Sequence, residues 1–354
     1  MTFKQLALAL PLALPSAAFS ATSNVDIYGL FSASFDLVDF DDPSRDNTSM
    51  VSSHASRLGF KGSEDLGGGL SAVWGTEAGI AIDGGGGTWG TRGQYVGLAS
   101  KSLGRLVFGG QLNTPHKMST VKLDAFGDSL ADYNTIIGQA SGTGGAGNRA
   151  IFDARAGNAV QYTTPSFSGL VFDVMYSQKN EAGSTTSDPE LWSLAANYTS
   201  GPLYLTAAWE KDYDYAASND RSSIKLGTGY SFGNTRVAGV YERMSQSGSG
   251  VFDRNAYYLS AVHKMGNIAL KAAYGRAGDS DAAAGDDGAS LWAVGADYSL
   301  SKRSTLFAIY ASLNNDTNGA FTMGQGTGAN SGAITPTAGG QDPGAFSLGL
   351  RHTF

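Results

Sequence analysis

Residues 25–37 read Val-Asp-Ile-Tyr-Gly-Leu-Phe-Ser-Ala-Ser-Phe-Asp-Leu, and this stretch decides the fold class. Apolar side chains occupy positions 25, 27, 31, 35 and 37, whereas most of the other positions are polar or small. Successive side chains of a β-strand point to opposite faces, so the stretch predicts a strand with one apolar face and one wet face. Similar alternation recurs in six later stretches, which begin near residues 170, 192, 224, 268, 292 and 346.

The connections between these stretches differ in length. Short turns are expected around residues 100–103, 164–168, 200–202, 233–234, 265–266 and 301–303, and longer loops lie between them. Trp209, Tyr298 and Tyr310 stand near strand ends, where aromatic residues form girdles at bilayer interfaces. Backbone groups in hydrocarbon must all be paired, so a spanning sheet has to close on itself. The sequence therefore predicts an all-β fold, a 16-stranded antiparallel transmembrane β-barrel over residues 21–354, with a lumen too wide for side chains to fill.

The first twenty residues have a different character. Lys4 precedes an apolar run that ends at Leu14, and Ala18-Phe19-Ser20 offers small residues at the two positions that a signal peptidase reads. A membrane anchor is the alternative, but Pro11 and Pro15 interrupt a run that is already short. We therefore expect residues 1–20 to be a secretory signal peptide.

Composition excludes several kinds of function. The 354 residues contain no cysteine, so disulfides and thiolate metal sites are impossible. The formal net charge is −7, which disfavours nonspecific binding of nucleic acid. None of the four histidines has metal-ligand spacing with another, and His54 and His116, which fall near predicted loops, are interpreted as solvated bystanders. We therefore predict no enzyme activity, no metal and no cofactor.

An acidic run near the C-terminal third could attract cations. Asp279, Asp281, Asp286 and Asp287 are clustered, but the glycine and the twelfth-position glutamate of a calcium loop are absent. The plain interpretation is a solvated loop. Bridging by divalent ions to lipopolysaccharide stays open as an alternative.

Residues 112–158 interrupt the regular succession of predicted strands and turns. They carry Lys117, Asp124, Asp128 and Asp132, followed by a patch rich in glycine, alanine and serine. A long insertion in a regular β chain is usually either functional or disordered. The residues of this insertion alone leave both alternatives open.

Several motifs resemble those of the general diffusion porins of Gram-negative outer membranes, in particular the branch outside the enteric porins. The matching segments are residues 25–29, 56–67, 91–98, 158–169 and 349–354, and together they span nearly the whole mature chain. The resemblance implies a homotrimer in the cell outer membrane, in contact with lipid and lipopolysaccharide. It also implies that residues 112–154, the third loop, fold into the lumen as a constriction, and that Phe354 is the signal for outer-membrane assembly.

The resemblance also implies a basic wall in the pore. By position within the matched motifs, Arg57, Arg92 and Arg155 correspond to the row of arginines that faces the third loop of the family. The alternation pattern also places Arg57 and Arg155 on the inner face, because the nearby positions that point outward are apolar. Lys61 lies on the same face as Arg57 and is added to the wall.

The carboxylates that face this wall are expected on the third loop. Asp124 and Asp128 are the first candidates, and Asp132 is the third. Opposed charges across a constriction would create a transverse field in the water between low-dielectric walls.

The implied function is a water-filled channel for passive diffusion of small hydrophilic solutes and ions. Charges at the narrowest point should outweigh rim charges, which are screened beyond about 8 Å at physiological salt, and this favours a weak anion preference. The alternative is an outer-membrane adhesin or receptor barrel with a plugged lumen.

Overall fold

The computed structural model describes residues 23–140, 149–150, 152–178, 190–216, 219–247, 252–281, 285–324 and 333–354. The predicted signal peptide, residues 1–20, lies outside the described residues. The first half of the chain contains β1 (Ser23–Asp39), β2 (Thr48–Ser53), β3 (Arg57–Gly67), β4 (Leu70–Ile80), β5 (Gly87–Thr88), β6 (Gln94–Ser100), β7 (Gly104–Gly110), β8 (Leu112–Asn113), α1 (Pro115–Thr120), the 3-10 helices η1 (Val121–Leu123) and η2 (Tyr133–Thr135), β9 (Gln139–Ala140), β10 (Arg149–Ala150), β11 (Arg155–Ala156), β12 (Ala159–Thr163) and β13 (Leu170–Gln178). The second half contains β14 (Glu190–Ser200), β15 (Leu203–Ala216), β16 (Asn219–Phe232), β17 (Thr235–Gln246), β18 (Phe252–Met265), β19 (Ile268–Ala277), β20 (Ala289–Ser299), β21 (Ser304–Asn315) and β22 (Gly344–Thr353).

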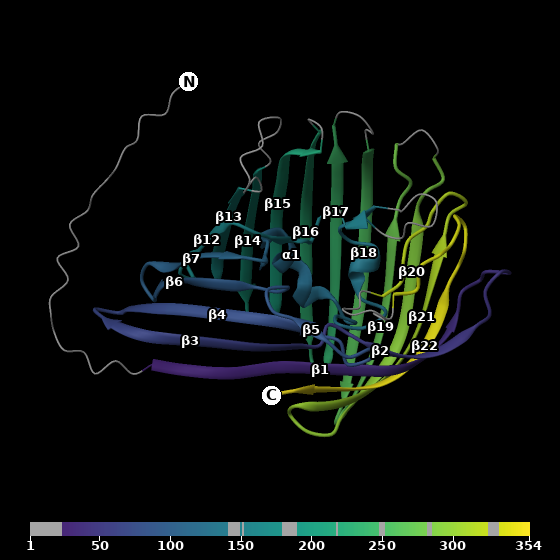
Figure 1. Cartoon of the computed structure of the whole chain (residues 1–354), viewed down its shortest axis with the longest axis horizontal. Helices are drawn as coiled ribbons and strands as arrows, with labels where there is room; N and C mark the ends of the chain where they lie inside the picture. Colours follow the sequence, from purple (N-terminus) through teal and green to yellow (C-terminus); the bar gives the residue numbers. More distant parts are fainter. Residues whose placement is uncertain are drawn as a thin grey trace.

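One antiparallel sheet closes into a barrel. Its 18 segments form sixteen strands in the described chain, because β2 and β3 both pair with β1, and β5 and β6 both pair with β4. The first strand pairs with the last, from Leu30 opposite Thr353 to Asp39 opposite Gly344, and this leaves no free edge. Strands on opposite walls cross in projection, as tilted barrel strands do (Figure 1). The predicted 16-stranded barrel is confirmed.

The last residue completes this seam. The backbone N–H of Phe354 donates to the carbonyl of Gly29 at 3.2 Å, and its ring meets that of Phe31 edge-on at 5.3 Å. A side chain at position 29 would collide with the ring of Phe354, so only glycine fits there. The role of Phe354 as an assembly signal stays a prediction.

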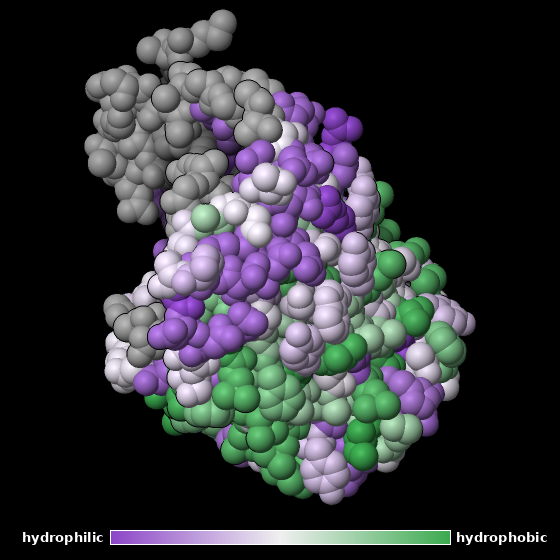
Figure 2. Space-filling model, turned by 90° about the vertical axis from the view of Figure 1, so that its right-hand side faces the viewer, coloured by the Kyte–Doolittle hydropathy of each residue, from purple (hydrophilic) through white to green (hydrophobic). Residues whose placement is uncertain are grey.

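An apolar belt covers the outside of the barrel. Residues predicted to face outward are exposed, for example Ile27 at 62%, Leu226 at 50% and Leu348 at 56%. On the face in Figure 2, hydrophobic residues gather over the lower part and hydrophilic residues over the upper part. Within the described residues, no helix is long and apolar enough to cross a membrane. The belt is the surface that the strands offer to lipid.

The lumen contains a hydrophobic core of its own, which the alternation pattern did not predict. Apolar residues of the third loop, including Phe126, Leu130 and Ile136, pack with inward-facing residues of the wall such as Leu291 and Phe307. The loop after β21 joins the same core through the buried residues Phe321, Met323 and Ile334. One side of the inner face is therefore apolar and covered by loops, so the water-filled space is much narrower than the barrel.

The outward belt makes a testable prediction for stability. We expect Val294→Arg, in the middle of β20, to reduce the free energy of unfolding by about 2–4 kcal/mol, because it buries a charge in hydrocarbon. Ser71→Arg, which places the same side chain on the inner face of β4 beside an open cavity, should change it by about 0.5 kcal/mol or less. Urea unfolding of the barrel in liposomes measures both. Equal losses would contradict the assignment of the two faces.

Candidate functional site

The third loop turns inward at helix α1. The hydroxyl of Thr114 accepts a hydrogen bond from the backbone N–H of Lys117 at 3.3 Å and caps the helix. Pro115 occupies the first turn, where its missing N–H has no partner to lose. The helix packs against β14, β15 and β16, so the chain leaves the rim and follows the inner wall.

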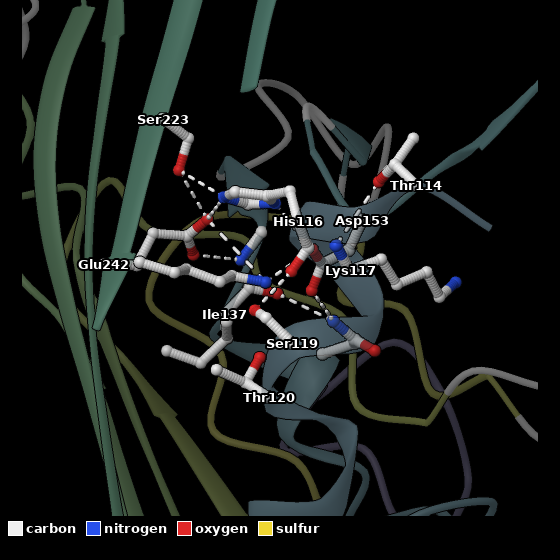
Figure 3. A network of polar contacts seen from close by, with 12 residues as sticks. Thr114, His116, Lys117, Ser119, Thr120, Ile137, Asp153, Ser223 and Glu242 are labelled. Atoms are coloured by element: carbon white, nitrogen blue, oxygen red, sulfur yellow. Dashed lines mark hydrogen bonds and ion pairs between the residues drawn. The ribbon is translucent and has the colours of Figure 1, made fainter. Parts of the chain in front are cut away.

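A buried polar network attaches both ends of the loop to this wall (Figure 3). His116, from the start of the loop, has Nδ1 3.1 Å from Asp153 and Nε2 2.9 Å from the hydroxyl of Ser223 on β16. Ser223 donates to Glu242 on β17 at 2.8 Å. Lys225 on β16 forms an ion pair with Asp153, from the end of the loop. The loop entry and exit are thus fixed at one place.

The interpretation of two histidines as solvated bystanders is wrong. His116 is 0% exposed and His54 is 2% exposed, and the Nε2 of His54 lies 2.6 Å from the hydroxyl of Ser34. Asp153, His116 and Ser223 follow one another in the order of a catalytic triad. Ser223 is only 1% exposed, however, so a substrate could not reach it. The network is structural.

Asp124, the first candidate for the carboxylate that meets the arginines, is occupied by other partners. Its Oδ1 accepts from the backbone N–H of Phe126 at 2.8 Å and from the hydroxyl of Tyr258 on β18 at 2.7 Å. Its Oδ2 accepts from the backbone N–H of Tyr133 at 3.1 Å. Asp124 therefore shapes the loop turn and fastens it to the wall.

Asp132 also stabilises the turn. Its two oxygens accept from the backbone N–H groups of Asn134 at 2.9 Å and of Asp128 at 3.1 Å. Burial, helped by the charges of Asp124 and Asp128, raises the pKa of Asp132 to about 8. Burial also raises the pKa of Asp124. The loop tip is therefore less negative at neutral pH than its three carboxyl groups suggest.

Of the three candidate carboxylates, Asp128 is the one that forms an ion pair with an arginine of the wall. Its Oδ2 lies 3.1 Å from Nη1 of Arg57. Arg92 pairs with Glu77 on β4 instead of with the loop. Within the described chain Arg155 has no ion-pair partner, and its Nε has no hydrogen-bond acceptor. The three arginines thus have three different electrostatic environments.

A cavity of about 520 Å³ lies between the loop tip and the arginine wall. Three predicted cations and three predicted carboxylates line it together: Arg57, Arg92, Arg155, Asp124, Asp128 and Asp132. We call this space the eyelet. Lys61, the fourth predicted cation, is not among the residues that line it. Its ammonium lies 5.2 Å from the ring centre of Tyr28.

Four charged residues beyond the predicted wall and the predicted carboxylates also line the eyelet: Lys117, Lys271, Asp297 and Arg351. Lys271 forms an ion pair with Asp297 at 2.8 Å. The alternation pattern places Lys271, Asp297 and Arg351 on the inner face, but it does not show that they reach the same height as the loop. Burial lowers the pKa of Lys117, which lies on the loop.

The acidic run offers a weaker candidate site. Asp279, Asp286 and Asp316 bring carboxylate oxygens within 4.8 Å of one another. Arg276 already bonds both oxygens of Asp316, at 3.0 and 2.6 Å, and supplies a positive charge there. This arrangement favours an arginine-bridged loop contact over a metal site.

Residues 6–318 match the family model described as Gram-negative porin. Outer membrane porin protein 32 of Delftia acidovorans is 28% identical, over 99% of this chain and 100% of the relative. The solved anion-selective porin from Comamonas acidovorans superposes with a TM-score of 0.78 at 26% identity, over 94% of this chain and 100% of that one. A trimer form of OmpT from Vibrio cholerae shares the fold, with a TM-score of 0.68 at 18% identity over 94% and 99%. The family match over most of the chain, on a closed barrel with an inward-folded third loop, shows that this protein belongs to the Gram-negative porins and forms a channel in the outer membrane.

Proposed function

We propose that the channel passes small hydrophilic solutes and ions by passive diffusion, with a weak preference for anions through the eyelet. One observation carries the proposal: six cationic side chains and four carboxyl groups line this space, a net formal charge of +2. Glu77, which pairs with Arg92, reduces the local excess to +1. The raised pKa of Asp132 restores part of this excess at neutral pH, and the lowered pKa of Lys117 acts in the opposite direction. The preference is weak because opposite charges are nearly balanced.

The sign of selectivity depends on these residues more than on the whole chain. The protein carries a net charge of −7, but charges at the loop rims are separated from the eyelet by water and salt. Mobile ions screen such charges beyond about 8 Å at physiological salt. Inside the eyelet the low-dielectric walls concentrate the field instead. The relative from Comamonas acidovorans is described as anion-selective, and this supports the same sign here.

The eyelet arginines should contribute unequally. We expect Arg155→Glu to shift the reversal potential in a salt gradient toward cation preference, because Arg155 is the one of the three predicted wall arginines without a carboxylate partner in the described chain. Planar-bilayer recordings of the variant and of the parent protein provide the measurement. The parent should show an anion-preferring reversal potential.

Arg45→Glu is the matched control, because it makes the same charge change in an exposed loop, where Arg45 donates to the carbonyl of Thr335. Its shift should be clearly smaller than that of Arg155→Glu. Equal shifts would refute the special role of the eyelet, and a cation-preferring parent protein would refute the proposed selectivity.

Selectivity should also depend on pH. Because the pKa of Asp132 is raised to about 8, its carboxyl group is mostly neutral below that pH and charged above it. Anion preference should therefore decline as pH rises from about 6 to about 10, as a negative charge appears in the eyelet. Asp132→Asn removes this group and should reduce the decline. An unchanged pH profile in Asp132→Asn would assign the titration to another group.

We further propose that the channel is a homotrimer embedded in outer-membrane lipid and lipopolysaccharide. The continuous apolar belt supports contact with lipid, and the trimer form of OmpT shows that this fold can assemble in threes. Light scattering in detergent should give a protein mass of about three chains. A monomer mass under conditions that preserve the barrel would contradict the trimer.

The remaining alternatives have less support. Members of the family are channels, and we propose that this chain has no enzyme activity, because its triad-like residues are buried. No observation on this chain favours the adhesin or receptor barrel.

A further inference from the structure

Arg351 connects the last strand of the barrel to the tip of the third loop. Its Nη2 donates to the backbone carbonyls of Gly127 at 3.1 Å and of Asp128 at 3.2 Å. Its guanidinium lies over the ring of Phe307 on β21, 5.7 Å from the ring centre. Arg351 is also opposite Ser32 in the register of β22 with β1, so it projects from the seam that closes the barrel.

Asp128 is fixed through all three of its polar groups. Its N–H donates to Asp132 at 3.1 Å, its carboxylate bonds Arg57 at 3.1 Å, and its carbonyl accepts from Arg351. Its φ angle is +56°, in the left-handed region that non-glycine residues seldom adopt. Aspartate tolerates this region better than most side chains, so the three contacts suffice to hold it.

We infer that Arg351 is a positioning residue for the eyelet: it fixes the backbone at Gly127 and Asp128 so that the Asp128 carboxylate stands against Arg57. This inference deepens the proposed function, since it rests on the eyelet being the selective region. Arg351 lines the eyelet, but its Nη2 already donates hydrogen bonds to the two carbonyls, and the ring of Phe307 lies under its guanidinium. Its task is therefore different from that of Arg155, which has no such partners among the residues that the structure describes.

The chemistry of arginine suits this task. A guanidinium is a planar, permanently charged fork whose donors have fixed directions, so one nitrogen can be aimed between two carbonyl oxygens. A lysine ammonium carries the same charge on a flexible stem and lacks this geometry. Replacing Arg351 by Lys therefore separates the fixed hydrogen bonds from the charge.

The position of the loop tip can be measured with one thiol. The chain has no cysteine, and Ser129, next to Asp128, is 3% exposed, so Ser129→Cys places a single buried thiol at the tip. Its reaction with the neutral reagent methyl methanethiosulfonate reports how often the tip moves off the wall. Ion selectivity does not enter this measurement, and the charge-conserving Arg351→Lys controls for the effect of a nearby charge on the thiolate fraction. Failure of the inference can therefore be distinguished from failure of the proposed selectivity.

We expect Arg351→Lys and Arg351→Gln each to accelerate the reaction of the Ser129→Cys thiol about tenfold, since a hydrogen bond to a charged donor typically changes an equilibrium by this factor or more. The Ala195→Cys thiol serves as the control, because Ala195 is a buried residue of β14, one of the strands against which α1 packs. Its reaction rate should not change. Acceleration by Gln but not by Lys would assign the effect to charge, and equal acceleration at both thiols would show general loosening. Either result overturns the inference, as does no acceleration of the thiol at the tip.

Arg351 lies on β22, the strand that closes the barrel against β1, so its variants could fail to assemble. Asp128→Asn provides an independent test, because it removes the ion pair with Arg57 but leaves the carbonyl that Arg351 contacts. If Arg351 positions the tip, the Ser129→Cys thiol should stay protected in this background, with a rate within about twofold of the parent. A tenfold acceleration there would mean that the Arg57 ion pair fixes the tip, and the inference would be wrong.

Discussion

The whole molecule depends on the need to pair every backbone N–H and C=O that lies in hydrocarbon. Closure of β1 against β22 meets this need without a free edge. It also assigns half of the side chains to the outside, where residues such as Ile27 and Leu348 form the apolar belt. The side chains of the inner face do not contact lipid. It can be polar where it meets water and apolar where another part of the chain covers it.

Both cases occur in this barrel. Under the third loop the inner wall carries Leu291, Phe307 and other apolar residues, which pack with the apolar side chains of the loop. Close approach is possible because glycines replace larger residues beneath it, for example Gly295 under Phe126. The opposite wall keeps its arginines. The loop thus divides a wide lumen into a dry core and a narrow, charged passage.

Much of this architecture is readable in the sequence, because alternation reports directly which face a side chain occupies. Arg57 and Arg155 could be placed by that rule, and Asp128 could be named as one of the candidate carboxylates. The rule could not choose Asp128 over Asp124, since the choice depends on Tyr258, which lies on β18, 134 residues away. The inner core was missed for a related reason. The sequence around an inward-facing apolar residue such as Leu291 does not indicate which loop will cover that residue.

The unequal environments of the three arginines also suit a diffusion channel. Conduction requires binding that is strong enough to draw an ion in and weak enough to release it. Three unpaired arginines around one small space would attract anions strongly and slow their exit. Here Arg57 and Arg92 each face a carboxylate, so an anion that approaches them competes with a fixed partner. Of these three, Arg155 alone offers a charge at the wall with no ion-pair partner in the described chain. In the proposed channel the paired residues would supply the transverse field, and the unpaired one would bias entry toward anions without creating a deep trap.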